Sequence, residues 1–451
     1  MAQPSKRANI WYFGQNAGLD FNNLDAEGHP SVLTDGQIKT DEGSAVISDE
    51  AGNLLFYTDG ETVWNRAHEI MPNGEGLKGS FSSTQSALIV PQPGSDRLYY
   101  VFTTAAQGGI DGLNYSVVDM TESGALGDVI IKNALLYTPT TEKLTAVLHT
   151  NGRDVWVITH KWESDEFYTY LVSEEGLDET PVISATGSIH EFGGSNGNTI
   201  GQMKVSSNGN ILALNISTEL RTEIFNFNCN SGTLQFIKAL TTVPTYDPSE
   251  VFMIYGMEIS LNESYLYISE SAPELYNGQK IYQVDINNEF SSVVEEVFIG
   301  GNLQKATDGR IYTVDVDQQE LVAIDRPNLP ADHPDFTISR ISITPGFCLL
   351  GLPNFIQSYL KVADPLVEMP NVFSPNEDGV NDTFLPKAFH RIETFQLKII
   401  DRSGALVYQT SSPEQWWDGG ASATGTYYWY LQYEGVNGKS GKLKGWVQLM
   451  R

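Results

Sequence analysis

Cysteine is scarce in this chain, because only Cys229 and Cys348 occur among its 451 residues. The two thiols fall in different units of the repeat pattern described below, so we expect no disulfide between them. Such thiol poverty is compatible with a reducing compartment and with an export route, and it does not decide between them.

Basic residues are also few, since 27 Lys and Arg stand against 56 Asp and Glu. The imbalance is uneven along the chain: 19 of the basic and 47 of the acidic residues precede Leu366. An acidic surface repels phosphate backbones, so we expect no nucleic-acid partner. A solvated acidic exterior of the large N-terminal part is the simplest interpretation.

Long hydrophobic runs are missing. No stretch of about 18 apolar residues occurs, so we expect no membrane span. The opening residues Met1–Arg7 lack the apolar core of a signal peptide. If the protein is exported, we therefore expect this sequence to be the mature form, with a leader encoded upstream.

The residues that are abundant indicate an all-β protein. Hydrophobic residues make up 41% and aromatic residues 11% of the chain, which is enough apolar surface to build a core. Glycine occurs 41 times and periodic helical runs are lacking, as expected for many strands joined by many turns.

A repeat runs through the first 360 residues. A polar turn precedes one β-rich segment, and a second follows after a loop, as in Asn208–Gly209, 211–214 and 223–227. Six such turns, at positions 52, 94, 152, 209, 263 and 309, are 42 to 58 residues apart. Periods of this length with several strands each are typical of β-propellers.

A seventh unit emerges when the two ends of this region are joined. Residues 351–359 resemble inner strands without outer partners, and 10–13 with 18–21 would supply the missing pair. Sharing one blade between the ends would leave no open sheet edge. We therefore predict a seven-bladed β-propeller over residues 1–361, with a six-bladed propeller as the alternative.

Beyond the propeller the sequence changes character. Residues 362–370 contain Pro365 and Pro370 and are predicted to form an extended linker. From residue 371 to 451, short β segments alternate apolar and polar residues, as at 395–399. We predict a small Ig-like β-sandwich there.

Several motifs of this C-terminal part occur in register with a known family. The segment 370–384 reads PNVFSPNEDGVNDTF, and it is followed by 395–404, Trp417–Gly419 and 425–430. This set resembles the gliding-motility-associated, type B sorting domain of Bacteroidetes proteins. Ser403 departs from the pattern, because the family usually has Trp or a similar residue there.

The resemblance implies export by the type IX secretion system. It implies as partners the outer-membrane translocon and a surface-docking outer-membrane protein, and localisation as a secreted or cell-surface protein associated with the outer membrane. The motif residues expected to carry this role are Pro370, Asn371, Phe373, Pro375, Asn376, Asp378, Gly379, Asn381, Asp382, Trp417, Asp418, Gly419, Gly425 and Tyr427.

One motif loop could bind a cation. Asn376, Asp378, Asn381 and Asp382 cluster side-chain oxygens around a glycine, as hard cations such as calcium require. The loop lacks the EF-hand spacing, and an Asx-rich turn that hydrogen-bonds its own backbone is the alternative. No other cofactor is expected.

No catalytic constellation stands out, so three functions remain open. The propeller acts as a binding or scaffold module linked to gliding or adhesion, with a glycan or protein ligand. Alternatively, the chain is a secreted carbohydrate-active or peptide hydrolase, which would need two converging carboxylates. Alternatively, it is a non-catalytic component bound to the translocon. Aromatic residues that could stack on sugars are Trp64, Trp162, Trp416 and Trp417.

Overall fold

A computed structural model describes residues 5–191, 196–241, 253–271, 279–289, 291–297, 300–315, 319–362, 364–436 and 438–451. The chain divides into two compact units, Met1–Lys361 and Val362–Arg451. Over the described ranges, no helix is long and apolar enough to cross a membrane. Cys229 and Cys348 are both free thiols.

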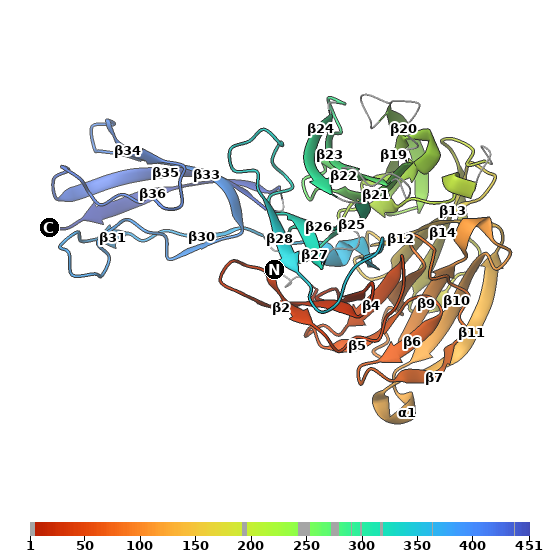
Figure 1. The fold of residues 1–451 in the computed structure, drawn as a ribbon. Helices are drawn as coiled ribbons and strands as arrows, with labels where there is room; N and C mark the ends of the chain where they lie inside the picture. Colours follow the sequence, from red (N-terminus) through yellow and green to blue (C-terminus); the bar gives the residue numbers. More distant parts are fainter. Residues whose placement is uncertain are drawn as a thin grey trace. The chain divides into compact units, whose positions relative to one another are not determined.

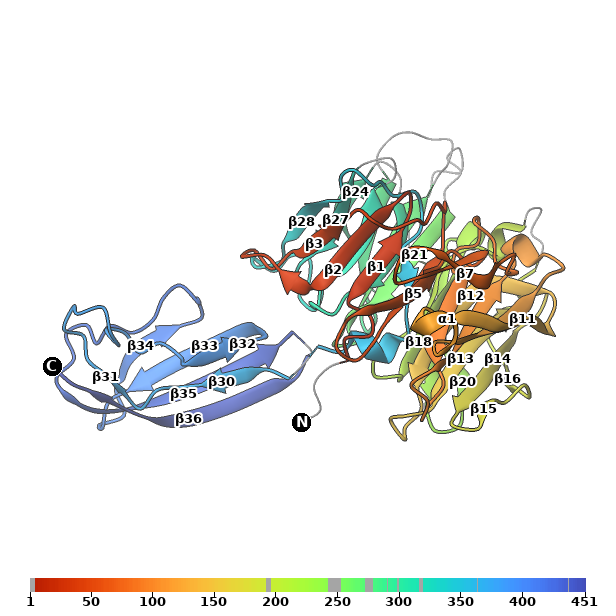
Figure 2. The same ribbon diagram turned by 90° about the horizontal axis from the view of Figure 1, so that it is seen from below.

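The described residues of the first unit form seven sheets, which follow one another along the chain (Figures 1 and 2). The strands of the first four sheets are β1 (Ile10–Phe13), β2 (Ala17–Leu24) and β3 (Pro30–Leu33); β4 (Ser44–Ser48), β5 (Leu54–Thr58), β6 (Thr62–Asn65) and β7 (Ile70–Glu75); β8 (Ala87–Pro91), β9 (Leu98–Thr104), β10 (Leu113–Asp119) and β11 (Asp128–Tyr137); and β12 (Thr140–Leu148), β13 (Val155–Lys161), β14 (Glu166–Ser173), β15 (Gly176–Leu177) and β16 (Val182–Ala185). Consecutive strands within each sheet pair in antiparallel ladders, except that β16 pairs with β14.

The last three sheets repeat the same order. Their strands are β17 (Met203–Val205), β18 (Ile211–Ile216), β19 (Arg221–Asn228) and β20 (Thr233–Thr241); β21 (Met253–Ile259), β22 (Tyr265–Ser271), β23 (Gln279–Asp285) and β24 (Ser291–Val297); and β25 (Gly300–Lys305), β26 (Ile311–Asp315), β27 (Glu320–Ile324) and β28 (Ile338–Ser342). A short helix, α1 (Glu122–Ala125), lies between β10 and β11, and a 3-10 turn, η4 (Gln357–Leu360), lies near the end of the unit.

The sheets stack through apolar residues on both of their faces. In β8, Ile89 packs in a core shared with the preceding sheet, whereas Val90 packs in a core shared with the following sheet. All five residues of β8 are therefore buried, and the strand reads as a continuous apolar run. Radial packing of this kind is what a propeller-like arrangement requires.

The two ends of the first unit meet, as the sequence predicts. The Trp11 ring lies 5.8 Å from the Phe355 ring and 5.7 Å from the Tyr312 ring of β26, measured between centroids. The last sheet thereby packs on the first, and Trp11 is fully buried between them.

The pairing at this junction differs from our prediction. We expected residues 351–359 to form one sheet with 10–13 and 18–21. Instead, β1, β2 and β3 form a sheet of their own, and β29 (Pro353–Asn354) pairs in parallel with β4 of the second sheet. Strand β29 is only two residues long, and the contact of Phe355 with Trp11 also holds this end of the chain.

The second unit contains a five-stranded and a two-stranded sheet. The larger sheet has the order β31 (Val372–Phe373), β36 (Ser440–Leu449), β35 (Gly425–Gly435), β33 (Ile392–Ile400) and β34 (Leu406–Thr410). The smaller one pairs β30 (Leu366–Glu368) with β32 (Ala388–His390). Residues 366–368, which we expected to lie in an extended linker, thus form a strand, because Val367 packs against the core of this unit.

The core of the second unit is aromatic. Phe373, Phe384, Phe395, Trp417 and Tyr427 are buried in one cluster. The predicted alternation in β33 is observed, since Phe395, Leu397 and Ile399 face this core. The cluster consists only of residues of the second unit, so this unit has an apolar core of its own.

Candidate functional site

The motif residues of the second unit fall into a buried and an exposed group. Pro370, Phe373, Trp417, Gly419 and Tyr427 are buried, whereas Asn371, Asn376, Asp378, Gly379, Asn381 and Asp418 are exposed, and Pro375, Asp382 and Gly425 lie in between. The buried group is structural. The Trp417 ring packs 5.1 Å from Phe373 and 4.9 Å from Tyr427, and the Trp417 carbonyl accepts the Phe384 N–H at 2.7 Å.

Asp382 organises the exposed loop. One of its carboxylate oxygens accepts the backbone N–H groups of Asn376 at 3.0 Å and Glu377 at 2.8 Å, and the other accepts Gly379 N–H at 2.8 Å. Partial desolvation opposes ionisation, but these three donors outweigh it and hold the pKa of Asp382 below its ordinary value. Gly379 has a φ of 82°, a left-handed conformation that suits glycine.

The residues predicted to bind calcium are held by hydrogen bonds within the loop. Both Asp382 oxygens face N–H donors, and the Asp378 oxygens accept Val380 N–H and the Asn376 amide, each at 2.8 Å. A carboxylate oxygen that accepts an N–H keeps a further lone pair, so these bonds do not test calcium binding, which stays a prediction. Among the described residues, no group of three or more His, Cys, Asp or Glu side chains could hold a metal ion. The loop is an Asx-rich turn closed by its own backbone.

The exposed motif residues gather at one end of the second unit. Strand β31 runs parallel to β36, so the loop after β31 leaves the sheet where the C-terminal residues do. The turn after Trp417 lies there as well, because the Arg451 guanidinium donates to the Gly420 carbonyl. We call residues 374–382, 418–420 and 450–451 the motif end.

The inner strands of the first unit bring buried acids together. The Tyr255 hydroxyl, from β21, donates to Glu42 at 2.7 Å, and the Thr84 N–H and hydroxyl donate to Glu142 of β12 at 2.8 and 2.7 Å. Burial, followed by the negative charge of Glu142, raises the pKa of Glu42 to about 8. Burial also lowers the pKa of Lys143 to about 7, although its ammonium donates to three backbone carbonyls.

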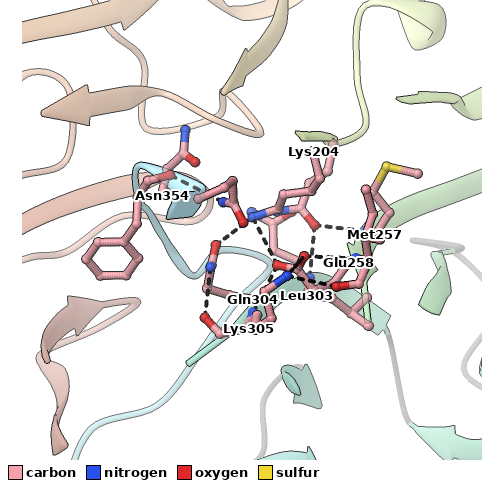
Figure 3. Close-up of polar contacts among 12 residues, drawn as sticks. Lys204, Met257, Glu258, Leu303, Gln304, Lys305 and Asn354 are labelled. Atoms are coloured by element: carbon pink, nitrogen blue, oxygen red, sulfur yellow. Dashed lines mark hydrogen bonds and ion pairs between the residues drawn. The ribbon is translucent and has the colours of Figure 1, made fainter. Parts of the chain in front are cut away.

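A second cluster lies on the inner strands β17, β21 and β25 (Figure 3). Lys204 donates to the Gln304 amide oxygen at 2.5 Å and lies 3.8 Å from Glu258, which also binds Lys305 at 3.1 Å. All three charged side chains are completely buried. Burial lowers the pKa of Lys204 to about 8; the Glu258 carboxylate opposes this shift, and the charge of Lys305 adds to it. We call Lys204, Glu258, Gln304 and Lys305 the lysine cluster.

Amide side chains tie inner strands across the first unit. Gln85, which precedes the third sheet, donates to the Met203 carbonyl in the fifth at 3.2 Å. Asn302 in the seventh sheet donates to the Thr84 carbonyl at 3.0 Å, and Asn354 of β29 donates to the Leu144 carbonyl in the fourth at 2.8 Å. These bonds join sheets that are not neighbours in the order, so polar side chains fill the region where the inner strands converge.

The aromatic residues proposed as sugar platforms are mostly packed. Trp162 and Trp417 are buried, Trp64 stacks on Tyr57 with centroids 5.6 Å apart, and Trp416 stacks on Phe395 at 5.6 Å. Trp446 is 51% exposed and carries no sequence motif that would mark it as a candidate. Its position in β36 opposite Tyr428 became apparent only from the strand register.

Comparison with known proteins identifies the second unit. Residues 367–449 match the CHU_C type IX secretion signal domain. No curated protein matches the chain significantly. The chain therefore carries a type IX secretion signal, which implies export to the cell surface.

The structural similarities concern mainly the first unit and the fold alone. A protein from Lactobacillus plantarum is similar at 13% identity and a TM-score of 0.48, covering 77% of this chain and 99% of that one. A putative 6-phosphogluconolactonase from Bacteroides fragilis has 11% identity, a TM-score of 0.47 and coverages of 77% and 97%. A β-propeller domain from Myceliophteria thermophila has 11% identity, a TM-score of 0.38 and coverages of 70% and 95%.

Proposed function

We propose that this protein is a non-enzymatic cell-surface protein of a Bacteroidetes bacterium, in which the second unit is the export and docking address and the first unit is a binding or scaffold module. The match of residues 367–449 to a type IX secretion signal domain carries the proposal. The partners would be the outer-membrane translocon and a surface-docking outer-membrane protein, and the ligand of the first unit would serve gliding or adhesion.

The separate core of the second unit supports its role as an address. A recognition signal has to be read independently of the cargo, and an apolar cluster made only of its own residues allows this. The motif end presents Asn376, Asp378 and Asp418 to solvent in a loop and a turn held by hydrogen bonds.

The polar centre of the first unit supports a binding role over a hydrolytic one. Glu42 and Glu142 are a candidate carboxylate pair, as a glycosidase would need. However, both are buried and hydrogen-bonded to protein groups, and amide side chains fill the neighbouring centre. Loops on the surface of the ring of sheets, where recognition ordinarily occurs, would then bind the ligand.

Export of truncated chains tests the proposal. The full chain with a type IX-compatible leader peptide, and a chain ending at residue 361, are produced in a bacterium with a working type IX system. We expect the full chain at the cell surface and the truncated chain in the periplasm. A second fusion of residues 362–451 to an unrelated periplasmic protein should reach the surface. Equal surface exposure of the truncated chain would refute the address.

The third function, permanent residence on the translocon, gives a different result in the same strains. A resident component would be recovered with the pore in stoichiometric amounts after export is complete. We expect the full chain to be recovered with the pore only transiently, and in pulse-chase labelling its pore-bound fraction should decline to background.

A further inference from the structure

The solvent face of the five-stranded sheet carries an apolar row that its fold does not require. Four residues directly opposite one another across β34, β33, β35 and β36 form it: Leu406, Ile400, Tyr428 and Trp446. They are 55%, 36%, 49% and 51% exposed, respectively. With strands about 4.8 Å apart, the row extends over about 14 Å.

The opposite face of the same strands already supplies the core. Leu397, Ile399, Leu431 and Val447 are buried there. The outer face of such an antiparallel sheet is ordinarily polar, because only one face is covered. A contiguous exposed apolar patch, by contrast, marks an interaction surface.

Lysines border the apolar row on one side. In the next row across the sheet, Lys398 lies opposite Tyr430, and Tyr430 lies opposite Lys444. Lys442 follows one row further, opposite Gln432. Neither the apolar row nor the row of Lys398 and Lys444 contains an acidic residue. A surface that complements the lysines is therefore acidic.

Two other occupants fit this pattern less well. A second copy packed face to face about a twofold axis perpendicular to the apolar row would place lysines near lysines, and like charges destabilise such a pairing. About an axis along the row, the lysines would face the uncharged Thr426 and Gln448 and would find no carboxylate. A sugar chain would stack on Tyr428 and Trp446, but Leu406 and Ile400 offer no aromatic face. Apolar protein side chains fit all four residues, and a polar rim around an apolar centre is the usual anatomy of a protein interface.

We propose that the outer face formed by Leu406, Ile400, Tyr428, Trp446, Lys398 and Lys444 is the surface through which the second unit docks on a protein of the type IX export apparatus, at an acidic site with an apolar centre. This inference rests on the proposed export function and specifies the face that makes the contact, which is distinct from the motif end.

Paired variants of the full chain test the face in a bacterium with a working type IX system. The double change Tyr428→Ser with Trp446→Ser should lower the surface-exposed amount at least tenfold, and Lys444→Glu at least threefold. The matched controls are Leu385→Ser, an equally exposed apolar residue outside the sheet, and Lys387→Glu. Both controls should stay within twofold of the unchanged chain.

A cross-linking measurement decides the question even if a variant folds poorly. Benzoylphenylalanine placed at position 428 of the otherwise unchanged chain should form an adduct with an outer-membrane protein of the export apparatus, identified by mass spectrometry. The same group at position 385 should form none. Tyr428 is exposed, so this replacement leaves the core intact.

The outcomes separate this inference from the proposed function. If removal of residues 362–451 leaves export unchanged, the export address itself is wrong. If that removal blocks export but the face variants are exported normally and position 428 forms no adduct, only the docking face is wrong. Normal export combined with lost binding of extracellular polysaccharide by the face variants would assign the face to a glycan and also overturn the inference.

Discussion

The centre of the first unit is built from charged and amide side chains, whereas the centre of the second is built from aromatic rings. In the first unit, Lys204, Glu258 and Lys305 are completely buried where inner strands converge. In the second unit, Trp417 and its aromatic neighbours occupy the equivalent place. Two all-β units of one chain thus bury opposite kinds of side chain at their centres.

Geometry accounts for the difference. The sheets of the first unit pack on each other through their faces, so the apolar residues of each strand are already used between sheets. What remains at the inner strands is backbone and polar side chains, which need hydrogen-bond partners when buried. The second unit has one main sheet with one covered face, and all its apolar residues on that face converge on one cluster.

The largest expected effect is on the aromatic core. Trp417→Ala should destabilise the second unit by about 3–5 kcal/mol, because a buried indole leaves a large cavity. Calorimetry of the full chain should show a lower unfolding temperature for the second unit and an unchanged unfolding temperature for the first unit. Trp446→Ala, at an exposed site of the same unit, is the control and should shift neither by much. A common shift of both transitions would contradict the separation of the two cores.

A comparable effect is expected at the lysine cluster. Glu258→Gln leaves two buried ammonium groups without a counter-charge and should cost about 3–5 kcal/mol. Denaturant unfolding of the first unit measures it, with the exposed Glu75→Gln as control. Adding Lys305→Met should restore part of the loss, since one uncompensated charge is then removed. No recovery in the double variant would show that Glu258 acts through packing alone.

The first unit should also be sensitive to acid. His160 and His190 are buried and stacked with centroids 3.9 Å apart, and burial lowers the pKa of His160 to about 3. The folded state keeps this ring neutral while the unfolded chain binds a proton below its ordinary pKa of about 6.5. The contribution of a neutral His160 to the free energy of unfolding is therefore fully present above pH 6.5. It falls as the pH falls, by about 2 kcal/mol at pH 5.

Comparing the unchanged chain with His160→Phe isolates the contribution of His160 to the pH dependence of stability. Glu42, whose pKa is raised, changes stability in the opposite direction between about pH 8 and 4.5, and it is common to both chains. Unfolding of the unchanged chain and of His160→Phe is followed from pH 7.5 to 5. The free energy of unfolding of the unchanged chain, relative to that of His160→Phe, should decrease toward pH 5. A difference that is independent of pH would show that His160 is not held neutral.

The smallest effect is expected at Gly445, where the absence of a side chain leaves room for the Trp429 ring to pack in the second unit. A Cβ at Gly445 would lie 2.5 Å from the Trp429 ring, so Gly445→Ala forces the indole to move. We expect a loss of about 1–3 kcal/mol in the second unit. The neighbouring Lys444→Ala, on the outer face, should leave the unfolding midpoint nearly unchanged. An equal effect of both changes would place the strain in the strand rather than at the ring.

Much of the architecture could be predicted from patterns that are local in the sequence. Turns such as Asn208–Gly209, with Gly209 at a φ of 79°, and the alternation at 395–399 depend on residues close together in the chain. The meeting of Trp11 with Phe355 followed from an incomplete repeat at each end. The pairing of β29 with β4 could not be predicted, because a two-residue strand carries no pattern.

The candidate sites were less accessible to sequence reasoning. Lys204, Glu258 and Lys305 are far apart in the chain, and each alone resembles an ordinary surface residue. The outer face was hidden for another reason. Tyr427, Tyr428, Trp429 and Tyr430 are consecutive aromatic residues, and only the register with β33 and β36 shows which of them point outward.

The sequence by itself determined the all-β character, the repeat of strands and the resemblance of the C-terminal part to a secretion domain, because each depends on residue types at short spacings. Only the tertiary structure decided which charges are buried together and which apolar residues stay exposed. Burial and contact depend on the register and packing of segments that lie far apart in the chain, and no local pattern encodes these distances.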